Sequence, residues 1–460
     1  MGVALEVLRV ALREVLRALA VPVHLLVFLA ARRRHVAATA RALAAAPPDP
    51  ADDAALPARV VKAVAGTPRV FLSCGEASGE ELALRLLDGL ATLRSGDASP
   101  APQILAFGGA RLAARGVELR FPLADHAVMG LGGVLRSIPL LLRAFAAYLR
   151  ILRDERIDLV VLVDYPGLHL VMAEAARRRG IPVVHYVAPQ YWAWGPWRMR
   201  RYRRAVDATL TILPFEPAFF GAAGLPSQYV GHPLLDAPPA PPLQDAHGDR
   251  PTLLLLPGSR RQEIALHLAP MVELARALRA DTPGLRVVIA HRDPRRVALI
   301  RELLAAQADT GFVEVLELEP RRVLPRARAC LVKSGTGSLE ACLHGVPSVV
   351  VYVVHGAFAR FVRRHLLTVP YFASANLCMA KELVPELAIE TAADWQRAGT
   401  RLRALWDDGE ERERCLSGLA ALRTRLGEPG ASQRAARWIQ ALSAGPRPAV
   451  RASRGSPTGP

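Results

Sequence analysis

Two segments of the chain place small and polar residues where an apolar run gives way to helical sequence. The first, residues 253–263, is an apolar run that stops at a Pro-Gly pair and continues through Gly258, Ser259 and Arg260 into a polar helix. Such a junction directs backbone N–H groups and the positive end of the helix dipole at one point, and Arg260 adds a cation. The segment predicts an anion site that suits a diphosphate, although an ordinary strand-to-helix turn with a surface arginine would have the same sequence.

The second segment, residues 332–340, repeats this arrangement. Ser334, Gly335 and Thr336 follow an apolar run and open a helix, so they predict another group of N–H donors. Glu340 lies about one turn into that helix, within reach of a ribose attached to a bound phosphate. Neither the GxxxxGK[ST] nor the GxGxxG spacing is present. Two anion loops in one half of the chain therefore point to a nucleotide-diphosphate sugar.

The other half of the chain supplies a candidate base. Asp164 ends an otherwise unbroken apolar strand, where a carboxylate is costly to bury without a task or a partner. It is a candidate general base, and its alternative role is to cap the next turn. An earlier loop holds Gly75, Glu76, Ser78 and Gly79. Its glycines permit close backbone approach, and its serine either caps the following helix or contacts a substrate.

Aromatic side chains gather in residues 185–194. Gln190 and Trp192 stand there with two further aromatic residues, after a strand. Aromatic faces support sugar rings or acyl chains, and a core cluster is the ordinary alternative. The basic run 198–204 follows directly. It is either a solvated helix face or a contact with anionic lipid.

These residues need a scaffold, and the chain from residue 69 alternates apolar segments with helical ones. This alternation predicts βαβ units and two doubly wound, largely parallel sheets facing a central cleft. The helical stretches include Glu80–Thr92 and Pro139–Arg153. The predicted strands are Val70–Ser73, Ile104–Phe107, Leu159–Val163, Val183–Val187 and Thr209–Leu213 in the first sheet, and Leu253–Leu256, Val287–Ala290, Val313–Leu316, Cys330–Val332 and Ser348–Tyr352 in the second.

Composition shifts divide the chain further. Residues 1–66 form an N-terminal extension with a linker, and residues 67–236 form the first α/β domain. A proline-rich linker over residues 237–250 separates it from the nucleotide-binding domain, residues 251–394. Residues 395–443 are expected to be helical, and the Pro/Ser/Arg-rich residues 444–460 are expected to be disordered.

The extension begins with a basic amphipathic helix, in which leucines recur at helical spacing beside arginines. An apolar run over residues 18–31 follows. At 14 residues it is shorter than the roughly 20 that a bilayer span needs. The arginine triplet after it argues against ordinary cleavage of an export signal there. An interfacial membrane anchor and a helix packed on the protein itself both fit this pattern.

Composition narrows the partners. The net charge of +17 comes almost entirely from arginine, and no nucleic-acid motif with interleaved aromatic residues accompanies it. We therefore expect no nucleic-acid partner. The five cysteines are odd in number, have no CxxC spacing and stand mostly in apolar runs. They predict buried thiols in a reducing compartment, without a zinc site.

Taken together, the segments described above resemble the lipid-A-disaccharide synthase family. Nine short segments carry this resemblance, in the family's order, from about residue 69 to about residue 425. They are Gly75–Gly79, Val128–Leu131, Val163–Pro166, His185–Val187 with Trp192–Trp194, Leu213–Glu216, Gly231–Pro233, Leu256–Arg261, Ser334–Thr336 and Asn376–Leu377.

The resemblance implies the GT-B fold and transfer of 2,3-diacylglucosamine from UDP to the 6-hydroxyl of 2,3-diacylglucosamine 1-phosphate. It implies inversion at the anomeric centre, with no metal and no cofactor. It also implies that the protein acts as a peripheral protein on the cytoplasmic face of the inner membrane. Members of this family can form homodimers that exchange C-terminal segments, so a homodimer is a further possibility.

Carried over by position, the resemblance makes Asp164 and Arg260 the residues that matter most for activity. In residues 67–236, the acceptor domain, Asp164 would take the acceptor proton or would position the acceptor, and Arg260 with the 334–336 loop would stabilise the departing UDP. Glu340 and Asn376 would hold the nucleotide. The family's apolar surface near the acyl chains corresponds to Val128, Met129, Leu131 and Leu135, for which simple core packing is the alternative.

Three positions depart from the family pattern. Gly167 stands where a second acid is common, His169 stands at an Asn position, and Lys381 replaces an arginine and loses its bidentate geometry. These changes are compatible with the donor chemistry that the resemblance implies, but they leave the identity of the acceptor undecided. Two alternatives therefore remain: a divergent paralogue that uses another glycolipid acceptor, and a catalytically silent, membrane-bound nucleotide-sugar-binding protein.

Overall fold

Two parallel β-sheets form the body of the computed structural model, which describes residues 2–50, 67–94, 102–126, 131–237, 241 and 250–444. The first sheet has seven strands in the order β3-β2-β1-β4-β5-β6-β7. Its strands are β1 (Arg69–Cys74), β2 (Gln103–Phe107), β3 (Glu118–Phe121), β4 (Leu159–Val163), β5 (Val183–Tyr186), β6 (Ala208–Thr211) and β7 (Ser227–Tyr229).

The second sheet has six strands in the order β10-β9-β8-β11-β12-β13, also all parallel. Its strands are β8 (Thr252–Leu256), β9 (Arg286–Ala290), β10 (Val313–Leu316), β11 (Ala327–Lys333), β12 (Ser348–Val353) and β13 (Glu386–Ile389). The predicted doubly wound α/β class is therefore confirmed, and every predicted strand is present within two or three residues of its expected bounds.

Three strands were not predicted: β3, β7 and β13. Each is an edge strand of three or four residues and carries polar side chains, as in Glu118–Phe121 and Ser227–Tyr229. Edge strands are only partly covered, so they lack the continuous apolar run that marks a buried parallel strand.

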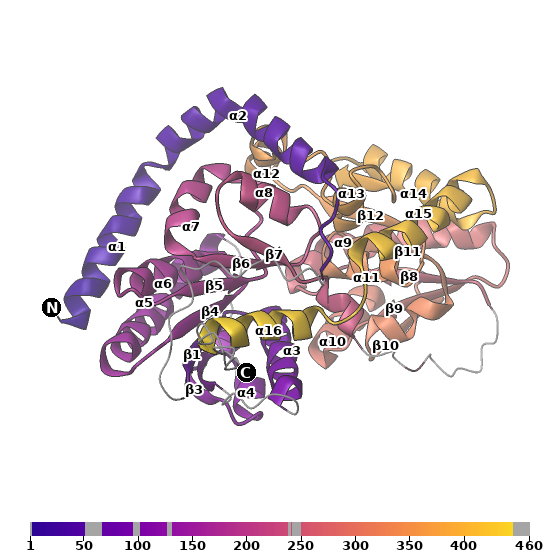
Figure 1. The fold of residues 1–460 in the computed structure, drawn as a ribbon. Coiled ribbons are helices and arrows are strands. Elements are labelled where there is room, and N and C mark those ends of the chain that lie inside the picture. The colour runs from indigo at the N-terminus through magenta and orange to yellow at the C-terminus, as the bar shows by residue number, and fades with distance from the viewer. Residues whose placement is uncertain are drawn as a thin grey trace, which may run out of the picture.

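Helices cover both faces of the two sheets (Figure 1). Around the first sheet lie α3 (Ala77–Arg94), α4 (Ala110–Ala113), α5 (Leu131–Asp154), α6 (Pro166–Arg178), α7 (Met199–Ala205) and α8 (Glu216–Ala222). Around the second lie α9 (Arg261–Ala280), α10 (Pro294–Ala305), α11 (Thr336–Leu343), α12 (Ala357–Phe361), α13 (Ser374–Met379), α14 (Ala392–Trp406) and α15 (Glu410–Leu426). Short helical turns are η1 (Ala124–His126), η2 (Pro196–Arg198), η3 (Pro233–Asp236), η4 (Pro320–Arg322), η5 (Leu324–Arg326) and η6 (Val362–Leu366).

The last helix, α16 (Ala431–Ala444), returns to the first sheet and packs along α3 (Figure 1). Asp236, at the end of the first domain's chain, accepts hydrogen bonds from the backbone N–H groups of Gly430, Ala431 and Ser432 at 2.7, 3.0 and 2.7 Å. A carboxylate at this position satisfies unpaired helix amides and complements the helix dipole. The predicted C-terminal helical region therefore contacts both domains. Its helices α14 and α15 pack on the second domain, and α16 packs on the first. The predicted linker lies mostly, and the predicted disordered tail almost wholly, outside the described residues.

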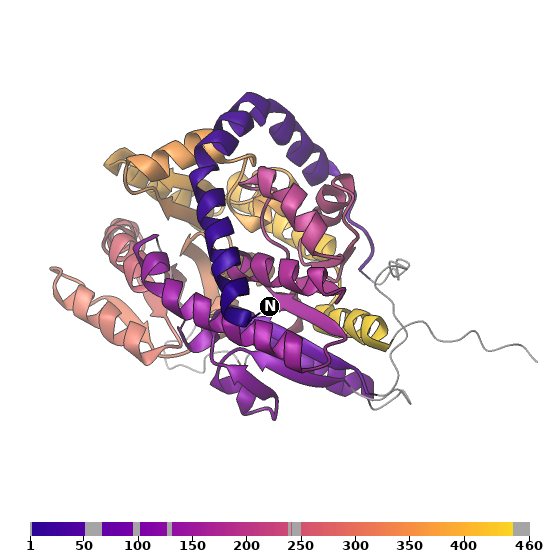
Figure 2. The same ribbon diagram turned by 90° about the vertical axis from the view of Figure 1, so that its left-hand side faces the viewer.

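The N-terminal extension forms α1 (Val3–Leu19) and α2 (Val21–Ala44), which cross the outside of the body as a bent strut (Figures 1 and 2). α1 lies against α5, and α2 reaches α8 and α13. Thr39 of α2 donates a hydrogen bond to the carbonyl oxygen of Trp192 at 3.2 Å. Among the described helices none is by itself long and apolar enough to cross a membrane; α1 and α2 meet that test only together, bent by 48°.

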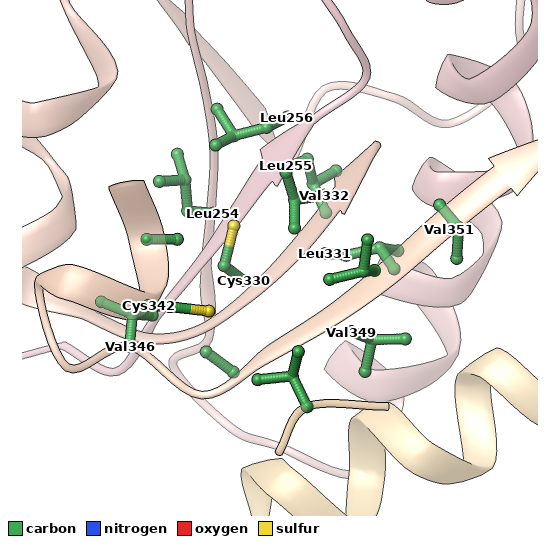
Figure 3. Packing of buried hydrophobic residues seen from close by; sticks show 14 of the residues in the cluster. Leu254, Leu255, Leu256, Cys330, Leu331, Val332, Cys342, Val346, Val349 and Val351 are labelled. Atoms are coloured by element: carbon green, nitrogen blue, oxygen red, sulfur yellow. The ribbon is translucent and has the colours of Figure 1, made fainter. Parts of the chain in front are cut away.

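The core of the second domain consists of aliphatic residues from β8, β11 and β12, interleaved with Cys330 and Cys342 (Figure 3). All five cysteines are buried with free thiols, as predicted. Burial raises the pKa of Cys415 to about 11, so this thiol stays protonated at neutral pH. The cysteines therefore act as small apolar core residues.

Candidate active site

Four of the loops identified from sequence follow the four strands at which the two sheets reverse their order; the aromatic loop within residues 185–194 follows β5 instead. In the first sheet the reversal falls between β1 and β4, and in the second between β8 and β11. Ligands of open parallel sheets bind beyond the carboxyl ends of the strands at such switch points. Residues 75–79 follow β1, Asp164 follows β4, residues 257–260 follow β8 and residues 334–336 follow β11.

The two switch points face each other. The guanidinium of Arg260 lies 3.8 Å from the carboxylate of Glu76, which joins the two domains across the cleft. Beside this ion pair is a cavity of about 470 Å³ that both domains line. Arg85 of α3 contributes from the first domain, and the segments 256–260 and 332–337 contribute from the second. The two predicted anion loops of the second domain thus line one cavity, whereas residues 75–79 and Asp164 are not among its lining residues.

Asp164 has the environment of a general base. Its side chain is largely buried, and burial together with the negative charge of Glu76 raises its pKa from 3.8 to about 6, against the hydrogen bond from the Tyr165 backbone, which lowers it. A carboxylate with a pKa this close to neutral pH holds an abstracted proton more readily than an ordinary aspartate.

The backbone of Asp164 is held in an unusual conformation. Asp164 and Tyr165 have φ angles of 52° and 53°, in the left-handed region that non-glycine residues seldom adopt. Two buried histidines hold the carbonyl oxygen of Asp164: His169 Nδ1 lies 2.6 Å away and His185 Nε2 lies 2.9 Å away. Burial lowers the pKa of His169 to about 3 and that of His185 to about 4, so both rings are neutral.

This contact fixes the tautomers of the two rings. A carbonyl oxygen only accepts, so His169 donates through Nδ1 and His185 through Nε2. The free Nε2 of His169 then accepts from the hydroxyl of Ser73, 2.9 Å away on β1. His169, which departs from the family pattern, is therefore a positioning residue for Asp164.

Replacing His169 by phenylalanine is expected to lower kcat roughly tenfold with little change in the donor KM. The ring is retained, but the donor to Asp164 and the acceptor for Ser73 are lost, at a cost of about 1–3 kcal/mol in stability. Steady-state kinetics and thermal unfolding measure the two effects. His355→Phe, at an exposed position, is the matched control. If the folded fraction of the His169→Phe protein had the kcat of the wild type, the positioning role would be contradicted.

The loop after β1 serves packing as well as the cleft. A Cβ on Gly75 would lie 2.2 Å from the ring of Tyr165, so this glycine makes room for the tyrosine that follows Asp164. Gly79 is buried in the first turn of α3. That helix begins at Ala77, so Ser78 lies inside its first turn, exposed, and not at the predicted capping position. Glu76 is the residue of this loop that reaches the facing domain.

On the opposite wall, Glu263 organises the cations. Its carboxylate accepts from Lys333 at 2.9 Å and from Arg260 at 3.2 Å, and also from the backbone N–H groups of Ser259 and Arg260 at 3.1 and 3.3 Å. Burial acts to raise the pKa of Glu263, but Lys333 and Arg260 hold it below its usual value. The two amides predicted to be free for an anion are thus occupied by Glu263 in this structure. The side chains of Arg260 and Lys333 carry the positive charge of this wall.

Gly258 is required by this arrangement. Its φ is 121°, and a Cβ there would lie 2.6 Å from the Cβ of Glu263. A side chain at residue 258 would therefore push Glu263 away from the amides and from Lys333.

The second predicted loop lines the cavity as expected. Ser334, Gly335, Thr336 and Glu340 are all among its lining residues. Gly335 caps α11 with a φ of 156°. Burial raises the pKa of Glu340, which favours a hydrogen bond or a cation at its carboxylate. Contact of Glu340 with a ribose stays a prediction.

Sequence reasoning missed several residues of the site. Glu263, Lys333, Arg85 and Arg321 line the cavity but were not among the predicted site residues. Glu263 and Lys333 belong to the segments 253–263 and 332–340. Only Glu263 has a local signal, because an acid at the third position of a helix is typical of a capping box. No local signal marks Arg85, because it lies on the middle of α3 in the other domain.

Two predicted substrate contacts lie elsewhere. Trp192 is 2% exposed, packs edge-on against Phe215 at 4.9 Å and donates from Nε1 to Glu216 at 3.0 Å. It belongs to the core, the alternative that the sequence left open. Gln190 is exposed and its backbone carbonyl accepts from Ala193 and Trp194. Neither residue lines the cavity beside Arg260.

Asn376 likewise has a structural role in the interior of the protein. It is fully buried; its Nδ2 donates to the carbonyl of Val384 and to Glu386, and its Oδ1 accepts from the amides of Leu383 and Val384, all within 2.8–3.0 Å. Its polar atoms are therefore fully used, and it does not line the cavity. The geometry assigns it to holding the segment after α13, not to direct contact with the nucleotide.

Asn376→Ala is accordingly expected to destabilise the protein by about 2–4 kcal/mol, because it leaves several buried backbone groups without partners. The protein that remains folded is expected to bind UDP as tightly as the wild type. Chemical denaturation and calorimetric titration with UDP give the two values. Weakened UDP binding at unchanged stability would restore the original assignment.

The predicted apolar contact surface is largely untested. Val128 and Met129 lie outside the described residues, and for Leu131 and Leu135 only their place at the start of α5 is described. Of the departures, Lys381 is exposed, and Gly167 lies at the start of α6, where a Cβ would meet open space.

Comparison with known proteins places this geometry in a family. The family model described as lipid-A-disaccharide synthetase matches residues 70–429. The lipid-A-disaccharide synthase of Myxococcus xanthus is 38% identical over 384 residues, covering 82% of this chain and 97% of that protein. That of Azotobacter vinelandii is 36% identical over 389 residues, covering 83% of this chain and 99% of that protein.

Solved structures agree on the architecture. A protein from Listeria monocytogenes described as a putative UDP-N-acetylglucosamine 2-epimerase superposes with a TM-score of 0.55 at 13% identity, covering 82% of this chain and 96% of that one. The glycotransferase of kitacinnamycin gives a TM-score of 0.54 at 17% identity, covering 82% and 100%. These likenesses concern the two-domain GT-B fold. With the matches along the sequence and the facing switch points, they lead to one conclusion: the chain belongs to the lipid-A-disaccharide synthase family.

Proposed function

We propose that this chain transfers 2,3-diacylglucosamine from UDP to the 6-hydroxyl of 2,3-diacylglucosamine 1-phosphate, yielding lipid A disaccharide 1-phosphate and UDP. The observation that carries the proposal is the placement of Asp164 and Arg260 on facing switch points, joined through Glu76. Glu76 pairs with Arg260 at 3.8 Å and raises the pKa of Asp164 by its charge. A base and a cation across one cleft suit transfer between an alcohol and a sugar diphosphate.

The proposed donor site is the cavity beside Arg260. The diphosphate would lie between Arg260, Lys333 and the 334–336 loop, and Glu340 would accept hydrogen bonds from the ribose. Positive charge at this place stabilises the negative charge that grows on the leaving UDP. Glu263 keeps the two cations in place and would release the amides of Ser259 and Arg260 if the diphosphate displaced it.

In the proposed step the acceptor oxygen forms a bond to the anomeric carbon while the bond from that carbon to the UDP oxygen breaks. Asp164 takes the proton of the attacking hydroxyl. Attack from the side opposite the leaving group inverts the anomeric centre. The histidine contacts to the Asp164 carbonyl hold the base in place during this step.

The direct test incubates the purified chain with UDP-2,3-diacylglucosamine and 2,3-diacylglucosamine 1-phosphate and follows disaccharide by mass spectrometry. We expect disaccharide and UDP in equal amounts. UDP release only with a different glycolipid acceptor would overturn the acceptor assignment and favour a divergent paralogue. UDP binding without turnover of any acceptor would favour a silent binding protein.

Both proposed substrates carry acyl chains, so we also propose that the protein works peripherally at the surface of the inner membrane. The homodimer implied by the family resemblance stays a prediction, which analytical ultracentrifugation would test.

A further inference from the structure

The N-terminal helix α1 docks on the body through valines and charged side chains. Val10 is buried, and Val3 and Val7 pack against the core of the first domain. The inward side of α1 also carries Glu6, Glu14 and Arg17, which pair with Arg179 at 2.7 Å, Arg201 at 2.7 Å and Glu174 at 3.2 Å. A surface helix of a globular protein usually turns its apolar stripe inward and its charges to solvent. Here ion pairs share the inner side with the three valines, and the leucines face outward.

The outward side of α1 and the first half of α2 form a continuous apolar surface, which we call the apolar ridge. Its defining residues are more than half exposed: Leu8, Leu12, Leu16, Leu19, Val23 and Leu26. Figure 2 shows α1 on the near face of the molecule, in front of the helices of the first domain. Contiguous exposed apolar surface of this kind marks a place that another apolar phase covers.

Behind α1 lies a second, strongly basic pocket of about 960 Å³, between the strut, α6 and α7. Eight arginines and two glutamates line it, a net charge of +6. Glu14 and Glu174 are already paired, whereas Arg13, Arg200 and Arg204 have no carboxylate partner within the described part of the chain. We call this the arginine pocket. Its charge complements a surface rich in phosphate groups.

The spacing of ridge and pocket matches a lipid interface. An amphipathic helix at a bilayer surface buries its apolar side about 5–10 Å into the boundary between headgroups and acyl chains. A helix with its side chains is about 10–12 Å across. Arginines directly behind α1 would therefore stand at the depth of the lipid phosphates while the ridge contacts the acyl chains.

We infer that the N-terminal extension is a docking device for an anionic bilayer, with the apolar ridge in the acyl boundary and the arginine pocket on the headgroup phosphates. The apolar ridge lies outside residues 70–429, which the family model matches, whereas six of the eight arginines of the arginine pocket lie inside them. The extension therefore adds the apolar part of the device to the family's catalytic body. Pro166 and Gly167, two and three residues after Asp164, line the same pocket, so the device brings the proposed base close to the lipid surface. This inference rests on the proposed function for its lipid substrates, but not for its test.

The test measures binding of the full chain to vesicles of phosphatidylcholine with and without phosphatidylglycerol. We expect Arg200→Gln with Arg204→Gln to weaken binding to phosphatidylglycerol vesicles about tenfold or more and to reduce its salt dependence. We expect Leu8→Gln with Leu12→Gln and Leu16→Gln to weaken binding to both kinds of vesicle. Leu266→Gln with Leu416→Gln, exposed apolar residues elsewhere, and Arg295→Gln with Arg437→Gln, exposed arginines, are the matched controls and are expected to bind as the wild type.

The variant with Leu8→Gln, Leu12→Gln and Leu16→Gln is called the ridge variant. If it bound vesicles as tightly as the wild type, the inference would be overturned. A ridge variant that changes only the oligomeric state in ultracentrifugation would also overturn it, because a second copy of the chain would then be the occupant. All variants are also assayed with substrates dispersed in nonionic detergent, where we expect wild-type rates. Vesicle binding by a wild-type chain that makes no disaccharide in detergent would sink the proposed function and leave the docking device standing.

Discussion

Asp164→Asn is expected to lower kcat by a factor of roughly 10²–10⁴ while leaving UDP binding unchanged. The amide has almost the shape of the carboxylate but cannot take the proton of the attacking hydroxyl. In the wild type, kcat/KM is expected to fall below about pH 6, tenfold for each unit, because burial raises the pKa of Asp164 to about 6 and the protonated form is no base. Kinetics from pH 4.5 to 8.5, roughly the range around that pKa, test this. Full activity of Asp164→Asn would exclude its role as the base.

The same substitution is expected to stabilise the protein. A carboxyl group whose pKa rises from 3.8 to about 6 on folding binds its proton more tightly in the folded state. Ionisation of Asp164 therefore costs stability as the pH rises from about 4 to about 6, and the full cost remains above that window. It amounts to about 3 kcal/mol at most. Thermal unfolding of Asp164→Asn should thus show a higher Tm than the wild type at pH 7.5, and a smaller gain near pH 4.

Arg260→Gln is expected to lower kcat/KM by roughly 10²–10³ and to weaken UDP binding about tenfold. Arg260 is half exposed in the cleft, so it is available to a diphosphate, and its guanidinium can bind two phosphate oxygens at once. Arg260→Lys should recover only part of the loss, because the ammonium keeps the charge and loses that geometry. Isothermal titration with UDP and steady-state kinetics measure both parameters.

Two controls separate the roles of the neighbouring groups. Arg261→Gln changes the next residue, which is exposed and does not line the cavity, and it is expected to behave as the wild type. Glu76→Gln removes the interdomain ion pair but retains Arg260, so UDP binding should persist. Because the charge of Glu76 raises the pKa of Asp164, Glu76→Gln should move the acidic limb of the pH profile to lower pH. Equal losses in Arg260→Gln and Arg261→Gln would mean that only net charge matters.

Much of the fold followed from local pattern. Buried parallel strands such as Leu159–Val163 and Thr252–Leu256 are unbroken apolar runs, since both of their faces are covered. The turns that follow them require glycine or a helix-starting residue, so the four loops of the site were visible in the sequence. The edge strands were not, because a partly exposed strand has no such run.

Residues of the site could be predicted from the sequence only where they lie in the loop or helix that follows a predicted strand. Asp164, Arg260 and Glu340 each stand in such a loop or helix. Arg260 and Glu340 line one cavity, and Asp164 lies on the facing domain, where the charge of Glu76 acts on its pKa. Asn376 and Trp192 have the polar and aromatic character of ligand contacts, but Asn376 satisfies buried backbone groups and Trp192 packs against Phe215. Whether a side chain points to a cavity or into the core depends on neighbours that are distant in the chain.

The sequence by itself determined the two parallel sheets, the chemistry of the four loops and the amphipathic character of the first helix, because each depends on residues close together in the chain. Only the tertiary structure decided that Glu263 holds Arg260 and Lys333, that two buried histidines hold the carbonyl of Asp164, and that α1 turns its leucines outward. The contact of Glu263 with Lys333 joins residues 70 positions apart, the contact of His185 with Asp164 joins residues 21 positions apart, and the orientation of α1 is a choice between two faces of one helix. All three are settled by the burial and charge of the surrounding elements, and not by any local periodicity.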